Sequence, residues 1–394
     1  MDNIKLLLQN NKKKAGYDIH KTKTSASFLW NEDYFSGATI KCILEFINKL
    51  LKTEKRKKIK VKEIYFRFLK PELKLEDKLT FIIFETICYS LMKDFDYKVH
   101  LFWEPKRSIE IDGVFSSPLK LLNGTKDKSH DKFLCKFKKE IHNNHFRKVI
   151  NTDEDSSYLS ILGQDIRGFL NKYNLSSDCK IEIAQVVTEM VGNAIEHSKS
   201  QCLIDIDITD PHRKVMQTNY NYVDKVEYYG VNIAILNYSE KLFHHELKKK
   251  LEIEKTFKNK AYQGVRTAYE AHRHYFKKNN YLEDDFWNIA CLQDKVSGRI
   301  DKDIQGGTGS TVLIKTLQEK ADKDKCYLIS GKRSLFFIKE YLNYNTENWI
   351  GFNESNDFFK NIPDDSVVCP CFINFPGTAY NLNFVLKGED DERI

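Results

Sequence analysis

The chain of 394 residues has no long hydrophobic run, little net charge and few closely spaced cysteines. No stretch approaches the roughly 18 apolar residues of a membrane-spanning helix, so no membrane span and no membrane contact are expected. The N-terminus offers only Ile4 and Leu6 to Leu8 as an apolar run, interrupted by Lys5. A secretory signal needs a longer run, so none is expected.

The charge and cysteine content exclude little by themselves. The 63 Lys and Arg exceed the 56 Asp and Glu by 7, which over a large surface gives a weak attraction to nucleic acid or acidic membranes. The nine cysteines are scattered, and the one close pair is Cys369 and Cys371 on an expected strand. Small core residues are favoured there over metal ligands. A reducing cytoplasm fits this cysteine usage best.

The length predicts two domains, and the apolar content is ample for two cores. Residues 1–120 are expected to form an α/β domain, because their pattern alternates between helical and strand periods. Its expected elements are helices at 38–51 and 76–94 and strands at 63–68 and 97–103. The strand–helix–strand order predicts a right-handed βαβ unit with parallel pairing. The basic run at 52–62 is interpreted as a solvated connection, with nucleic-acid binding as the alternative.

A boundary is expected at 121–157, where two polar breaks flank a predicted helix at 133–150. The remainder, 158–388, is expected to be an α+β domain with a long polar, helix-prone lid at 239–305. An acidic tail, 389–394, follows. The domain's expected helices are 158–173, 178–198 and 311–321, and its expected strands are 202–208, 231–238, 326–330, 334–338, 366–375 and 379–386.

The segment TEMVGNAIEHS, residues 188–198, carries the most chemical information. On a helix, Glu189, Asn193 and Glu196 fall within about 60° of one another. An inward-facing Asn beside a Glu is costly unless both are used. An Asn oxygen can complete a Mg²⁺ shell of phosphates and waters, and a Glu one turn earlier can orient a water facing a γ-phosphate. An ordinary polar helix face is the alternative. A separate apolar stripe, expected to pack on a sheet, consists of Val187, Met190, Val191 and Ala194.

Three further segments gain meaning only in combination. GGTGST leads into a predicted helix, where glycines let backbone N–H groups approach phosphate and the helix N-terminus adds its dipole. A tight connection is the alternative. Asn237 is the polar exit residue of the strand ending ILNYSE, and FPGTAYNLNF predicts a hairpin with Thr378 after Pro376-Gly377. The GGTGST segment, called the glycine segment below, consists of Gly306, Gly307, Thr308, Gly309, Ser310 and Thr311.

In this order, these segments resemble the GHKL ATPase superfamily, which includes gyrase, histidine kinases and the anti-sigma serine kinases. The resemblance covers about residues 155–388, and the run from Asn193 to His197 is closest to the anti-sigma kinase form. It implies a two-layer α/β sandwich that binds ATP and Mg²⁺. In such a site Glu189 would be the catalytic carboxylate, Asn193 the Mg²⁺ ligand, and the glycine segment the phosphate contact. Thr378 would help to hold adenine.

The sequence departs from the family pattern at Asn237, where the family has an Asp that accepts from the adenine amino group. The next three residues, Tyr238, Ser239 and Glu240, include none of the glycines that follow the Asp in the family. An Asn amide can rotate and offer its oxygen to adenine or its NH₂ to guanine, so weak discrimination between ATP and GTP is expected. His245 opens a run resembling the phospho-acceptor box of histidine kinases. It lacks the usual proline and follows residues 188–198, so a solvated lid helix is favoured. By element order, residues 1–120 resemble STAS-like partner domains.

The resulting expectation is a cytoplasmic regulatory protein. Mg-ATP binding or hydrolysis would close the lid and change how the N-terminal domain, a protein partner or a second copy is presented. One alternative is a serine/threonine protein kinase acting on a partner, and another is a nucleotide sensor without turnover. A nucleic-acid-associated ATPase using residues 52–62 is a third, and nucleic acid is the less expected partner.

Overall fold

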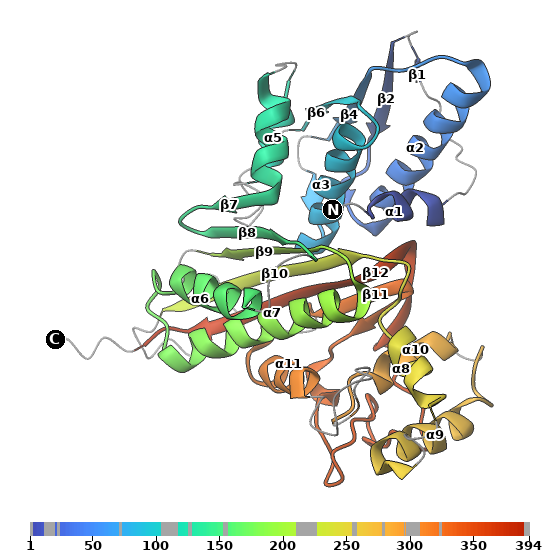
Figure 1. Cartoon of the computed structure of the whole chain (residues 1–394), viewed down its shortest axis with the longest axis vertical. Helices are drawn as coiled ribbons and strands as arrows, with labels where there is room; N and C mark the ends of the chain where they lie inside the picture. Colours follow the sequence, from blue (N-terminus) through green and yellow to red (C-terminus); the bar gives the residue numbers. More distant parts are fainter. Residues whose placement is uncertain are drawn as a thin grey trace, which may run out of the picture.

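The computed structural model shows mixed α/β structure, with an N-terminal unit stacked on a larger sheet (Figure 1). The residues that it describes are 3–11, 20–21, 24–70, 73–103, 117–124, 128–152, 157–209, 227–253, 258–277, 280–294, 296, 308–322 and 325–389. None of the helices in these ranges is long and apolar enough to cross a membrane.

The N-terminal unit is built on a sheet of order β1-β2-β4-β6, in which β2, β4 and β6 are parallel. The strand–helix–strand order and the parallel pairing of the predicted βαβ unit are confirmed, since β4 pairs parallel with β6 and α3 connects them. A short pair, β3 and β5, lies apart from this sheet. The elements are α1 (Lys5–Asn10), β1 (His20–Lys21), β2 (Ser25–Trp30), β3 (Tyr34–Phe35), α2 (Gly37–Lys57), β4 (Glu63–Phe68), β5 (Lys74–Leu75), α3 (Lys78–Lys93) and β6 (Lys98–Phe102).

Helix α2 shows how the local sequence sets these elements. Ser36 caps its start by accepting from the backbone N–H of Ala38, and Thr39 caps the N–H of Ser36 in return. The helix continues six residues beyond its expected end, to Lys57, because basic side chains in the last turn suit the negative end of the helix dipole. It stops at Lys58, which adopts a left-handed conformation with φ 50°.

The C-terminal sheet has the order β11-β12-β10-β9-β8-β7, and all neighbouring strands are antiparallel. Helices α6, α7 and α11 cover one of its faces. The elements of this part are β7 (Lys139–Ile141), β8 (His145–Ile150), α6 (Tyr158–Leu170), α7 (Ser177–Ser198), β9 (Cys202–Ile208), β10 (Tyr228–Tyr238), α11 (Thr308–Lys320), β11 (Tyr327–Phe336), a short 3-10 turn η3 (Lys339–Tyr341) and β12 (Val368–Lys387).

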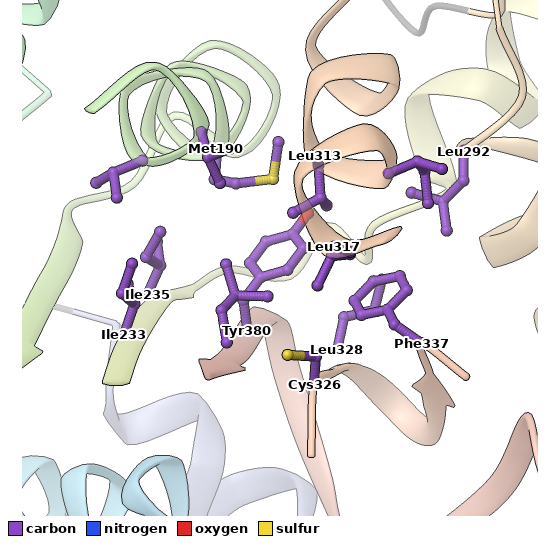
Figure 2. Close-up of a cluster of buried hydrophobic side chains, with 14 of the residues drawn as sticks. Met190, Ile233, Ile235, Leu292, Leu313, Leu317, Cys326, Leu328, Phe337 and Tyr380 are labelled. Atoms are coloured by element: carbon purple, nitrogen blue, oxygen red, sulfur yellow. The ribbon is translucent and has the colours of Figure 1, made fainter. Parts of the chain in front are cut away.

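Side chains of β10 alternate between two cores. Ile233 and Ile235 pack with the helices α6, α7 and α11, whereas Ala234 and Leu236 pack with the N-terminal unit. On that second face α1 and α2 contact β12, and α3 contacts both β10 and β12. The larger sheet therefore has a helical layer on one side and the N-terminal unit on the other. Figure 2 shows the first core, where Met190 of α7, Leu313 of α11 and Tyr380 of β12 come together.

The structure corrects the helix expected at 133–150. After η1 (Pro118–Leu122), helix α5 (Lys128–Lys138) ends early, and residues 139–150 form the β7–β8 hairpin at the edge of the sheet. The turn closes with a hydrogen bond from His142 N to His145 O. The pattern in β8 has a period of two, because Phe146 enters the helical core and Arg147 points to the other face.

Two further expectations are corrected in the last strands. The strands expected at 326–330 and 334–338 are one strand, β11, with register shifts around Gly331. The hairpin expected in FPGTAYNLNF is absent from the described β12, which runs unbroken for 20 residues. Gly377 takes φ 101° and lets the chain stay in the sheet, because a Cβ there would lie 2.3 Å from the carbonyl oxygen of Asn237.

The described part of the predicted lid is helical, as expected. It contains α8 (His245–Leu251), α9 (Lys260–His272) and α10 (Glu283–Ala290). A buried ion pair attaches this segment to the sheet: Arg333 Nε of β11 lies 2.6 Å from Asp285 Oδ1 of α10. Arg333 also donates to the carbonyl oxygen of Asn280. The lid helices therefore have a fixed attachment to β11.

Candidate functional site

Helix α7 carries two of the residues singled out by the sequence. Ser176 caps it, and the expected apolar stripe packs on the sheet: Val187, Met190 and Val191 are buried. Glu189 and Asn193 are half-buried and Glu196 is exposed. The helix thus presents Glu189 and Asn193 at the margin of the core rather than in open solvent.

The position of Glu182 shows which neighbour this margin faces. Glu189 follows Glu182 by seven residues and Asn193 follows it by eleven. At about 100° per residue, seven residues fall about 20° short of two turns and eleven pass three turns by about 20°. Glu189 and Asn193 therefore point within about 20° of Glu182 around α7. Glu182 forms an ion pair with Lys320 of α11. The α7 face with Glu189 and Asn193 is consequently the face that turns toward α11.

Helix α11 begins inside the glycine segment, three residues before its expected start. Thr308, Gly309, Ser310 and Thr311 form its first turn. Gly306 and Gly307 lie outside the described residues. The hydroxyl of Thr311 donates to Asp294 Oδ1 at 2.9 Å. This contact, which the sequence did not indicate, ties the start of α11 to the segment that follows α10.

Strand pairing brings Asn237 and Thr378 together. They are direct partners in the β10–β12 register, and both are on the sheet face covered by α7. The sequence places these residues about 140 positions apart, and only the antiparallel pairing makes them neighbours. Both are largely buried, with Asn237 2% and Thr378 9% exposed.

Asn237 is fixed by a small hydroxyl network at the C-terminal end of α7. Its Nδ2 donates to Ser198 Oγ at 2.8 Å and to Ser200 Oγ at 3.1 Å. Ser198 Oγ itself donates to the carbonyl oxygen of Ala194, so it can only accept from Asn237. The amide is therefore held with its NH₂ toward the serines and its oxygen away from them. The freely rotating amide expected from the sequence is corrected on this point.

Ser198 and Ser200 are the site residues that sequence reasoning missed. Ser198 ends the 188–198 segment, but a serine at a helix end is usually a capping or turn residue and gave no functional signal. His197, its neighbour, accepts through its backbone carbonyl from Lys241 Nζ at 3.0 Å. His245 lies in the first turn of α8, where its Nδ1 accepts from the backbone N–H of Leu242.

The opposite face of the sheet holds a buried charge cluster. Lys78, the first residue of α3, lies 2.7 Å from Asp205 Oδ1 and also contacts Asp207. Arg147 bridges Asp205 and Glu85, and His145 Nε2 lies 2.9 Å from Asp205 Oδ2. All these side chains are at most 2% exposed. The cluster joins the N-terminal unit to β8 and β9.

Burial and ion pairing act in opposite directions within this cluster. Burial alone raises the pKa of Asp205, but attraction to Arg147, His145 and Lys78 outweighs it and holds the pKa well below its usual range. Burial alone lowers the pKa of Lys78, yet the two aspartates raise it overall. Burial raises the pKa of Glu85, although Arg147 opposes this.

The described residues contain no group of three or more His, Cys, Asp or Glu side chains that could hold a metal ion. Cys369 and Cys371 lie on β12, as expected, and both are half-buried. Comparison with known proteins finds no matching family model, no matching curated protein and no matching solved structure.

Proposed function

We propose that residues 158–388 form a Mg-ATP site of the GHKL type and that the protein uses it as a regulatory switch. The observation that carries this proposal is the arrangement around α7. Glu189 and Asn193 face α11, whose first turn contains Thr308 to Thr311 of the glycine segment, and Asn237 and Thr378 meet on the adjoining strands. A nucleotide lying along this margin would meet all three sets of residues.

The donor types fit such a ligand. The Asn193 side-chain oxygen would supply one ligand to Mg²⁺, which usually keeps phosphates and waters as its other ligands and needs no carboxylate cluster. Bound Mg²⁺ would neutralise phosphate charge. The N–H groups in the first turn of α11 point toward the helix N-terminus, where an anion is stabilised. In this proposal Glu189 would hold a water or hydroxyl facing the terminal phosphate.

The hydrogen bonds that hold Asn237 affect which nucleotide base the proposed site would accept. Because the serines hold its NH₂, the amide oxygen is the group left to accept a hydrogen bond, and the amino group of adenine is a donor. We therefore propose that the site prefers adenine to guanine, in contrast to the weak discrimination expected from the sequence.

Calorimetry with ATP, with and without Mg²⁺, tests the proposal. We expect the wild type to bind ATP more tightly with Mg²⁺ than without it. Asn193→Ala should bind ATP equally with and without Mg²⁺, because the metal loses its one protein ligand. Gln185→Ala, an exposed change on the same helix, is the matched control and should behave as the wild type. Equal losses in both conditions would indicate misfolding, and no binding by the wild type would refute the site.

Labelled ATP then separates the possible outcomes of binding. Release of free phosphate indicates a regulatory ATPase, and label on an added protein indicates a kinase. Binding without either product indicates a nucleotide sensor. Each result requires the same bound Mg-ATP, so the calorimetry is done first.

A further inference from the structure

One short segment of the chain carries a dense run of basic residues. Residues 52–67 contain eight Lys and Arg and two Glu, a net charge of 8 − 2 = +6, while the whole chain carries +7. The basic residues are Lys52, Lys55, Arg56, Lys57, Lys58, Lys60, Lys62 and Arg67.

The structure places this charge on the surface where α2 ends and β4 begins. All seven basic residues from Lys52 to Lys62 are exposed. Among the described residues, Lys60 is the one of these seven that forms an ion pair, 3.3 Å from the exposed Asp96. The helix dipole accounts for the basic last turn of α2. It does not account for Lys60 and Lys62, which lie beyond the end of that helix.

Directly after this basic segment, β4 carries aromatic and guanidinium groups on the β2–β4–β6 face turned away from α2 and α3. Tyr65 of β4 pairs in register with Ser27 of β2 and His100 of β6, and Arg67 pairs with Phe102. The Tyr65 and His100 rings stack at 4.9 Å, and the Arg67 guanidinium lies 4.3 Å over the Phe102 ring. The rings of Tyr65 and Phe102 and the Arg67 side chain are half-buried, so each keeps an accessible part.

We propose that this sheet face, with Tyr65, Arg67 and Phe102, binds single-stranded RNA together with the basic segment 52–62 at the edge where α2 ends and β4 begins. Exposed lysines would contact phosphates, and unpaired bases would stack on the rings and the guanidinium plane. A duplex keeps its bases stacked inside and offers only its phosphates. The Ser27 hydroxyl, opposite Tyr65, is a partner for a ribose 2′-hydroxyl, which favours RNA over DNA. This proposal does not depend on ATP binding.

Fluorescence anisotropy with a labelled, mixed-sequence RNA of about 12 nucleotides tests it. Replacing three exposed lysines, Lys55→Gln, Lys57→Gln and Lys62→Gln together, should reduce the slope of log affinity against log salt by about 2, since each lost phosphate contact on a single strand contributes roughly 0.7. The matched control has the same charge change at three exposed lysines elsewhere and should leave the slope unchanged. Its substitutions are Lys332→Gln, Lys339→Gln and Lys360→Gln.

The contribution of the Tyr65 ring to RNA binding is tested separately. Tyr65→Ala should weaken binding by about 5- to 150-fold, because stacking on one base contributes about 1–3 kcal/mol. Tyr65→Phe keeps the ring and should bind nearly as the wild type, although both variants lose the hydroxyl bond to Glu63. An unchanged affinity in Tyr65→Ala, or an equal effect of the control lysines, would overturn the proposal. So would equal binding of DNA of the same sequence, of duplex RNA or of anionic lipid vesicles.

Discussion

Replacing Lys78 by Met should strongly destabilise the protein, because it removes one partner of a buried ion cluster. Methionine keeps much of the apolar volume, so the change acts mainly on charge. Asp205 retains Arg147 and His145 as partners. Within the part of the chain that the structure describes, the side chain of Asp207 keeps one contact, a hydrogen bond from Asn232 Nδ2 at 3.0 Å. The uncompensated buried charge in the variant is therefore mainly that of Asp207.

Breaking a buried ion pair from one side typically costs about 3–5 kcal/mol. Because Asp205 keeps Arg147 and His145 while Asp207 loses its ion pair, we expect the free energy of unfolding to fall by an amount near the lower end, about 3 kcal/mol. That is a large part of the roughly 5–15 kcal/mol by which a domain is stable. Lys60→Met is the matched control, since it breaks another Lys–Asp pair, but an exposed one. It should cost less than about 1 kcal/mol.

Urea unfolding at pH 7, followed by circular dichroism, measures both variants against the wild type. Acid unfolding adds an independent check through Asp205. A carboxylate whose pKa is depressed on folding contributes stability that is present above about pH 4 and lost as pH falls through the folded-state pKa. Lys78 contributes to that depression, so its removal should move acid unfolding to higher pH. Equal small losses in Lys78→Met and Lys60→Met would refute the buried cluster.

The remaining predictions concern the proposed nucleotide site and its strand. Glu189→Ala should keep ATP binding and lower any hydrolysis by about 10² to 10⁴. Glu196→Ala changes an exposed glutamate two turns further along the same face of α7 and should leave hydrolysis unchanged; normal turnover in Glu189→Ala would exclude the proposed role of Glu189. Asn237→Asp should raise the ratio of ATP to GTP affinity about five-fold, as a charged acceptor adds about 1 kcal/mol, and competition binding would show an unchanged ratio if this residue does not face the base. Gly377→Ala should destabilise by about 1–3 kcal/mol because of its φ of 101° and its contact with Asn237, whereas Gly168→Ala, in open space on α6, should stabilise slightly; thermal unfolding distinguishes them.

Elements with a strong periodic pattern could be predicted from the sequence. The strand at 63–68 and the strand at 202–208 were placed at their observed ends, and the helix around Asn193 within one residue. In each, the side chains repeat with one clear period and polar residues mark the ends. The helix expected at 133–150 failed because Asn143 and Asn144 are turn residues that split a mixed segment, and β8 gained its strand form by pairing with β9.

Long strands could not be predicted as single elements. The Pro376-Gly377 pair inside β12 has the composition of a hairpin turn, yet β10 and β11 pair with the chain on either side of it. Such pairing depends on neighbours that are distant in the sequence, and a local pattern carries no information about them. The same holds for the serines that orient Asn237, which meet it only after α7 packs across the sheet.

The sequence by itself determined the mixed α/β class, the βαβ unit and the shared helix face of Glu189 and Asn193, because these follow from spacing within one element. Only the tertiary structure decided which elements face one another. Asp205 and Asp207 alternate along β9 as solvent-facing residues would, yet Lys78 buries both, because the N-terminal unit covers that face. Buried charges of this kind need an opposite charge beside them, and here that charge, Lys78, comes from a distant part of the chain, so the pairing exists only in the folded protein.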